Sequence, residues 1–135
     1  NRPFFAGLRP WASLPTLKLK RLACKEQMMS EACCVVFITV GSREEAEKMS
    51  DALVGERLAA CCNVVSGLLS VYRWEGEVHR EPEVLLIAKT RQDLFERFRE
   101  RVVALHGYEV PEIVALPIVA GHMPYLDWIR RETAQ

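Results

Sequence analysis

The chain has 135 residues, 50% of them hydrophobic, with 18 basic and 18 acidic residues. This length suits one domain with a genuine core, and zero net charge gives no general attraction to nucleic acid or anionic membranes. No apolar run reaches the roughly 18 residues that a membrane-spanning helix needs.

The charge is unevenly spread along the chain. Residues 1–32 hold six basic and two acidic residues, a net charge of +4, whereas residues 33–135 hold 12 basic and 16 acidic residues, a net charge of −4. We therefore expect a basic leader or extension over residues 1–32 and a folded domain over residues 33–135.

The leader has no acidic residue before Glu26 and three closely spaced prolines, Pro3, Pro10 and Pro15. Core strands and helices do not tolerate prolines at this spacing, so we predict that residues 1–32 are disordered. A basic, acid-free N-terminus is typical of organelle transit peptides, although serine is scarce here. Two alternatives stay open: a transit-like leader, which would make the protein mitochondrial, and an unstructured extension of a cytoplasmic protein.

Five cysteines include two adjacent pairs, Cys33 with Cys34 and Cys61 with Cys62, and no CxxC spacing occurs. Neighbouring strand residues point to opposite faces, so an adjacent pair cannot readily chelate one ion. We interpret these cysteines as small buried hydrophobic residues in a reducing compartment.

The first elements follow a strand–helix–strand pattern. Residues 33–40 form a continuous apolar, β-branched run, which predicts a central strand. Ser42 and Glu45 have the spacing of a capping box, which predicts a helix start. That helix is expected to end between Gly55 and Leu58, before another apolar run over residues 59–65.

A long hairpin comes next. Residues 68–74 and 78–90 form two extended arms, joined by Glu75 and Gly76 in a two-residue turn that places glycine where a positive φ is needed. The tip of this hairpin carries Tyr72 and Trp74.

The last part of the chain predicts a second helix, a strand and a short final helix. Thr90 and Asp93 are expected to open the second helix, and Gly107 lies where a left-handed C-cap would be. Residues 113–119 read as the next strand, and Pro124 suits the first turn of the final helix.

The predicted order, β-α-β-β-α-β with a terminal helix, indicates an α+β, ferredoxin-like fold. Right-handed crossovers place both main helices on one face of the sheet. The opposite face is also apolar and needs a cover. In so short a chain with so long a hairpin, oligomerisation is the simplest cover.

Few side chains suggest chemistry. None of the three histidines has a His or Cys three or four positions away, so no local metal cage exists. His106, at the expected end of a helix, reads either as a capping cation or as a ligand. Glu81, Glu83, Glu109 and Glu112 could pair as acid–base carboxylates, but no catalytic motif accompanies them, so we predict a non-enzymatic protein.

RNA-recognition modules share the ferredoxin-like sheet, and they stack bases on aromatic residues of the central strands. Here those strands are aliphatic apart from Phe37, and the folded part is acidic. Binding to nucleic acid is therefore disfavoured.

Five motifs occur in order and resemble those of the CutA divalent-cation-tolerance family. They are Leu58-Ala-Ala-Cys-Cys-Asn63, Tyr72-Arg-Trp-Glu-Gly76, Glu83-Val-Leu-Leu-Ile-Ala-Lys-Thr90, His106-Gly-Tyr-Glu-Val-Pro-Glu-Ile113 and Tyr125-Leu-Asp-Trp128. The resemblance covers roughly residues 34–133. It implies a homotrimer of ferredoxin-like subunits whose long hairpins wrap their neighbours, similar to the PII signalling proteins, which bind effectors between subunits.

The resemblance also implies two functions. Bacterial relatives are linked to copper tolerance, with Cu(II) bound by a cysteine and two histidines; the cysteine position falls on Thr39 and one histidine position on Leu105, which leaves His106. Animal relatives are associated with anchoring of acetylcholinesterase, which implies a trimeric adaptor for another protein as the alternative to binding Cu(II) or another divalent cation.

A cleft between subunits would be the place for a ligand. Lys89 and Glu83 lie on one strand at an even spacing and therefore face the same side. They read as an ion pair, either with each other or with Glu109 across a subunit boundary, that fixes the register of the trimer, or as an anchor for a small anionic ligand. Trp74 and Trp128 read as interface anchors or as ligand stackers. The residues expected at this cleft are Glu83, Lys89, Tyr108, Glu109, Trp74 and Trp128.

Overall fold

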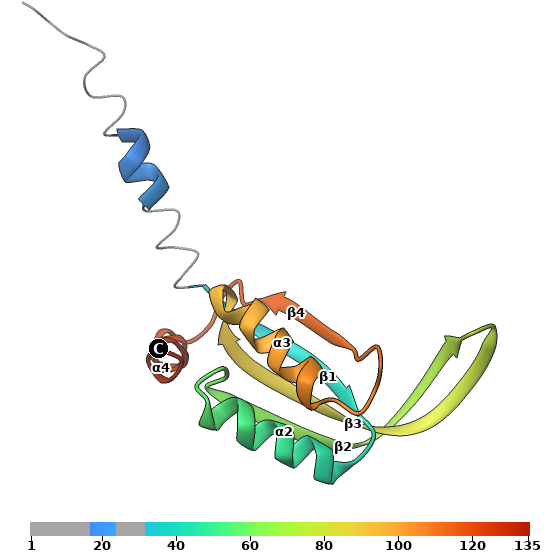
Figure 1. Ribbon diagram of the computed structural model, residues 1–135. Coiled ribbons are helices and arrows are strands. Elements are labelled where there is room, and N and C mark those ends of the chain that lie inside the picture. The colour runs from blue at the N-terminus through green and yellow to red at the C-terminus, as the bar shows by residue number, and fades with distance from the viewer. Residues whose placement is uncertain (1–16, 24–31) are drawn as a thin grey trace, which may run out of the picture.

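The computed structural model describes residues 17–23 and 32–135 (Figure 1). Residues 17–23 form a short exposed helix. The other residues of the leader that was predicted to be disordered lie outside the described residues, except for Ala32. The elements are β1 (Cys33–Val40), α2 (Arg43–Gly55), β2 (Cys61–Trp74), β3 (Glu77–Arg91), the 3₁₀ helix η1 (Gln92–Leu94), α3 (Phe95–Leu105), β4 (Ile113–Pro117) and α4 (Met123–Glu132).

The four strands form one antiparallel sheet in the order β2-β3-β1-β4. Helices α2 and α3 lie side by side over one face of it (Figure 1). This is the ferredoxin-like topology that the order of elements predicts, so the predicted α+β fold class is confirmed. No helix within residues 17–23 and 32–135 is both long and apolar enough to cross a membrane.

The core lies between the sheet and these two helices. Strand β1 buries alternate residues completely, among them Val36 and Ile38, because every second side chain of a strand points to the helical face. The stripe that α2 contributes is Ala46, Met49 and Leu53, and α3 contributes Phe98 and Val102. A second small cluster joins α4 to the sheet through Cys33, Ala60, Leu126 and Ile129.

The hairpin of β2 and β3 extends past the rest of the sheet (Figure 1). Strand β1 pairs with β3 only from Val84 to Arg91, so residues 77–83 pair with β2 alone. The turn is the predicted one: Glu75 has φ 49° and Gly76 has φ 83°. Positive φ at both central residues matches the right-handed twist of the two arms.

Thr90 does not open the second helix, as the sequence suggested, but lies in β3 with its side chain fully buried. Its hydroxyl donates to the carbonyl oxygen of Leu58 at 2.6 Å and so connects β3 to the segment after α2. Helix α3 follows η1 without any side-chain cap. The prediction was wrong because the Thr90 hydroxyl forms a hydrogen bond with a residue 32 positions away, and the local sequence pattern does not reveal such a contact.

Gly107 does not form a left-handed cap either. The C-cap of α3 is His106, which is extended with φ −78° and ψ 141°. The left-handed residue after a helix is instead Arg57, with φ 58°, after α2. At Gly107 the chain passes close to Glu45: an added Cβ would lie 3.3 Å from Glu45 Oε1, so a larger residue there would displace that side chain by a few tenths of an ångström.

Thr90→Val is expected to lower the free energy of unfolding by about 1 to 3 kcal/mol, because it leaves the buried Leu58 carbonyl without its donor. Urea denaturation at one protein concentration measures the loss. Thr39→Val is the control: it makes the same change in β1 on the face away from the helices, and its cost should be near zero. Equal effects at both positions would contradict the role of this bond.

Candidate functional site

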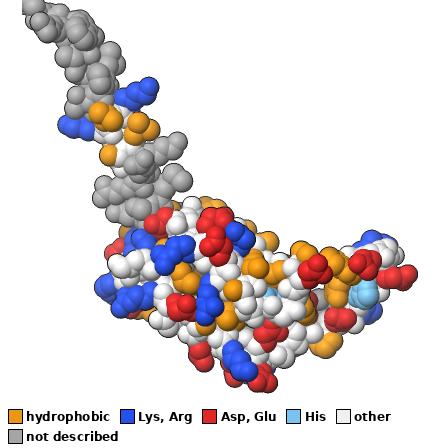
Figure 2. Space-filling model, in the orientation of Figure 1, with side chains coloured by type: hydrophobic (Ala, Val, Ile, Leu, Met, Phe, Trp, Pro, Cys, Tyr) orange, Lys and Arg blue, Asp and Glu red, His pale blue; other side chains and the backbone are white. Residues whose placement is uncertain are grey.

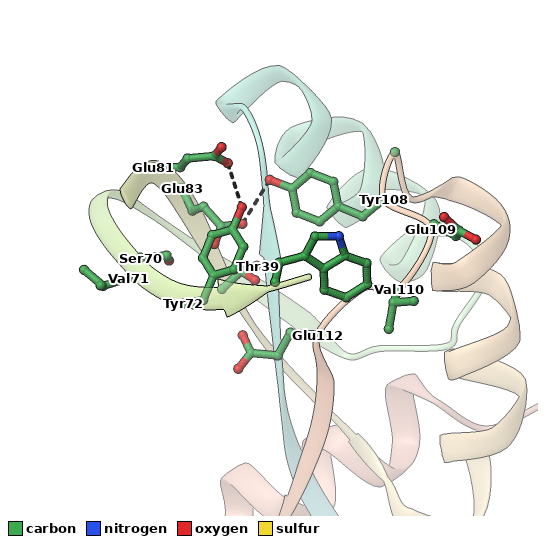
Figure 3. A pocket seen from close by; sticks show the side chains of 12 residues that line it. Thr39, Ser70, Val71, Tyr72, Glu81, Glu83, Tyr108, Glu109, Val110 and Glu112 are labelled. Carbon is green, nitrogen blue, oxygen red and sulfur yellow. Dashed lines mark hydrogen bonds between the residues drawn. The ribbon is translucent and has the colours of Figure 1, made fainter. Parts of the chain in front are cut away.

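A pocket of about 700 Å³ lies where β1 ends and the hairpin leaves the sheet. The hairpin forms one wall and the loop after α3 forms the other (Figure 3). The lining residues are Thr39, Ser70, Val71, Tyr72, Trp74, Glu81, Glu83, Gly107, Tyr108, Glu109, Val110 and Glu112.

Two tyrosine hydroxyls meet two carboxylates in this pocket (Figure 3). The Tyr108 hydroxyl donates to Glu83 Oε2 at 3.0 Å, and the Tyr72 hydroxyl donates to Glu81 Oε2 at 3.1 Å. Burial, together with the bond to Glu83, raises the pKa of Tyr108 to about 12. Tyr108 is therefore a neutral hydrogen-bond donor at physiological pH.

Four carboxylates line the pocket: Glu81, Glu83, Glu109 and Glu112. Within residues 17–23 and 32–135, none of them forms an ion pair with a Lys, Arg or His. The pocket is thus strongly acidic, and no basic side chain from the described part of the chain lines it.

His106 lies directly behind this pocket with its side chain fully buried. Its Nε2 lies 2.7 Å from the Thr39 carbonyl oxygen, and its Nδ1 lies 3.0 Å from the Tyr108 backbone nitrogen. A carbonyl only accepts and an N–H only donates, so Nε2 carries the proton and Nδ1 accepts. Both ring nitrogens are therefore used to hold the loop after α3 against the end of β1.

Glu45 fastens the same loop to α2. Its Oε1 accepts a hydrogen bond of 2.8 Å from the Gly107 N–H, while its own N–H donates to Ser42 Oγ at 3.2 Å. Only this half of the predicted capping box forms, because the Glu45 side chain turns to the loop instead of to the start of its own helix. The sequence carried no signal for this contact across 62 positions.

The pocket brings together four of the residues predicted for a cleft, Trp74, Glu83, Tyr108 and Glu109. The other two lie elsewhere. Lys89 donates to Asn63 Oδ1 on the neighbouring strand and forms no ion pair with Glu83 among the described residues of one subunit; an ion pair across a subunit boundary stays a prediction. Trp128 packs beside Tyr125 on α4, with ring centroids 5.5 Å apart.

Sequence reasoning missed part of the lining. Ser70 and Tyr72 were not placed in a cleft, and Glu81 and Glu112 were recognised only as carboxylates without geometry. The available signal was alternation: Ser70, Tyr72 and Trp74 share one face of β2, and Ser70 pairs with Glu81.

The described residues include no group of three or more His, Cys, Asp or Glu side chains that could hold a metal ion. Burial also raises the pKa of Cys34 and Cys62 to about 11, so the thiolate form that binds metals is scarce at neutral pH.

These features define a class: an α+β protein of ferredoxin-like topology with a projecting hairpin and an acidic pocket at its base. Residues 34–132 match the family described as "CutA1 divalent ion tolerance protein", and the chain belongs to this family. The predicted resemblance is thereby confirmed.

Individual relatives agree with this assignment. The chain is 58% identical over 99 residues to "Divalent-cation tolerance protein CutA" of Thermus thermophilus, which covers 73% of this chain and 96% of that protein. It is 50% identical over 142 residues to "Protein CutA, chloroplastic" of Arabidopsis thaliana, which covers 98% of this chain and 78% of that protein.

Solved structures agree as well. The Cut A1 structure from Thermus thermophilus has a TM-score of 0.74 and 56% identity, and the match covers 76% of this chain and 99% of that chain. CutA1 from Oryza sativa has a TM-score of 0.75 and 43% identity, with 77% and 95% covered.

Glu45→Ala is expected to accelerate amide hydrogen exchange at Gly107 by about tenfold, because that N–H loses its charged acceptor. Exchange followed by NMR or mass spectrometry measures this. Glu44→Ala is the matched control on the same helical turn, since among the described residues Glu44 pairs only with exposed Lys48. Unchanged exchange at Gly107 in Glu45→Ala would show that the contact does not hold the loop.

Proposed function

We propose that this protein acts in divalent-cation tolerance as a non-enzymatic homotrimer that binds a divalent cation. The observation that carries the proposal is the apolar face of the sheet opposite the helices. Phe37 lies at its centre, with Ile87 and Val114 paired to it on either side. Val114 and Leu116, on the edge strand β4, are 45% and 48% exposed and extend this apolar face to the edge of the sheet.

The hairpin also supports assembly, because it too exposes apolar side chains. Leu69, Val71 and Val78 are each more than half exposed on it, and Figure 2 shows hydrophobic side chains interspersed with acidic ones along the projecting arm. Two isolated strands are marginally stable in water, so an arm of this length gains from packing on a second copy. The family resemblance supplies the number of subunits, three.

Cu(II) is the cation that this proposal tests first, with His106 as its ligand. Imidazole is a good copper ligand, whereas the surrounding carboxylates suit harder cations such as Mg²⁺ or Mn²⁺. To bind copper, His106 has to give up its bond to the Thr39 carbonyl or to the Tyr108 N–H. A neighbouring subunit would complete the ligand set.

The second candidate is an adaptor that docks another protein and binds no ion. The exposed Trp74, at 47%, and the apolar β4 edge favour it. The two functions differ in one measurable property, the uptake of a cation by the assembled protein.

Native mass spectrometry of the whole chain, with and without Cu(II) at a low ratio, tests both assembly and uptake. We expect a trimer that binds a defined number of ions per subunit. Phe37→Arg should yield monomers because it places a charge on the apolar face, while Val103→Arg, on the exposed side of α3, should leave the trimer intact. His106→Ala should abolish uptake, and His122→Ala, at an exposed histidine, should not.

A monomeric parent protein would refute the assembly. A trimer without discrete uptake, or one whose uptake survives in His106→Ala, would refute the cation site and shift the weight to the adaptor.

The same proposal assigns residues 1–32 a targeting role. Their basic composition supports it, as does the match over nearly the whole chain to two plant relatives named chloroplastic. A fusion of residues 1–32 to a fluorescent protein should enter chloroplasts in plant cells. Location in mitochondria would correct the organelle, and a cytosolic fusion would refute targeting.

A further inference from the structure

Glu83 is a buried charge without a counter-charge. The residue is only 9% exposed, and its hydrogen-bond partner among the described residues is the neutral hydroxyl of Tyr108. Burying a carboxylate is costly unless a positive group compensates it, and one neutral donor satisfies an oxygen without removing the charge. The side chain faces the pocket (Figure 3).

Three further carboxylates surround the same space. Glu81 accepts a hydrogen bond only from the Tyr72 hydroxyl, and Glu109 and Glu112 have no side-chain partner among the described residues. In Figure 3, Glu109 lies on the opposite side of the pocket from Glu81 and Glu83. The negative charges are therefore distributed around the cavity.

This distribution does not suit one bare metal ion. A divalent cation needs several oxygens at about 2.0 to 2.6 Å from a single point. The described residues contain no such group, and a pocket of about 700 Å³ is far larger than an ion. Carboxylates that are spread apart are matched by positive charges that are also spread apart.

The walls between the carboxylates are apolar and aromatic. Trp74, Tyr72 and Tyr108 line the pocket together with Val71 and Val110. Aromatic rings attract alkylammonium groups through their π faces, and they also pack against methylene chains. The ligand chemistry that fits is an elongated organic cation: ammonium groups separated by short aliphatic segments.

We propose that this pocket binds an aliphatic polyamine, with Glu83 and Glu81 receiving ammonium groups and Trp74 packing against the chain between them. This site goes beyond the cation site proposed at His106 and does not depend on it. Its hairpin wall, which includes Val71, is also the arm proposed to pack on a second copy, so the site requires that the pocket stays open beside that contact.

Isothermal titration calorimetry of the full chain with spermidine, at fixed ionic strength, tests the proposal. We expect saturable binding of one spermidine per subunit, weaker binding of the shorter putrescine, and no saturable binding of Mg²⁺ in this pocket. Glu83→Gln keeps an acceptor for Tyr108 but removes the charge, and it should weaken spermidine binding by about tenfold. Trp74→Leu should weaken it by about threefold.

Glu100→Gln is the matched control. It removes the same charge from an exposed position on α3 outside the pocket, and it should change the affinity less than twofold. Circular dichroism melts establish that each variant folds, and Glu81→Gln replaces Glu83→Gln if the latter does not.

Three outcomes would overturn the proposal. One is the absence of saturable binding, which is also the result if a basic side chain of a second copy already occupies the pocket. Another is equal weakening by Glu83→Gln and Glu100→Gln, which would indicate attraction to net charge alone. The last is competition by Mg²⁺ at equal ionic strength with spermidine. Because copper uptake is measured separately at His106, either proposal can fail while the other stands.

Discussion

Strand β3 organises this molecule because its two halves are paired differently. From Val84 to Arg91 it lies between β1 and β2, and its alternate residues fill the core beneath the helices. From Glu77 to Glu83 it pairs with β2 alone and leaves the domain as a hairpin arm. The change comes where β1 ends at Val40. Strand β3 is longer than β1, and this difference in length produces the packed body, the projecting arm and the pocket between them.

The pocket is built at that step, and three elements meet there. Glu83 is the last residue of the arm before pairing with β1 begins, and Thr39 lies at the facing end of β1. The loop after α3 closes the third side, fastened by His106 to Thr39 and by Glu45 to the Gly107 N–H. These contacts of His106 and Glu45 thus position a wall on which Glu109 and Glu112 have no side-chain partner among the described residues. Such a division of roles is common where a rigid scaffold presents a binding site.

Elements with a local pattern could be predicted from the sequence, and contacts between distant elements could not. The apolar run over residues 33–40, the helix start at Ser42 and the turn at Gly76 each depend on neighbours a few positions away, and each was predicted correctly. Thr90 and Glu45 were misread because their partners lie 32 and 62 positions away and competed successfully with local capping. The sequence identified the carboxylates of the candidate site as residues that could pair. It could not predict which of them lie around one pocket, because that depends on the register of the hairpin.

The strand pairings at the two edges of the sheet connect segments that are separated by very different lengths of chain. The hairpin joins β2 to β3 through two residues, so the entropy lost in closing that loop is small. Strand β4 instead completes the sheet by pairing Cys34 with Pro117, at the far end of the domain sequence. Such long-range closure raises the contact order, which slows folding. The arm that exposes Leu69, Val71 and Val78 is therefore the part of the sheet whose pairing costs the least loop entropy, whereas the pairing of β4 depends on the whole domain sequence between its ends.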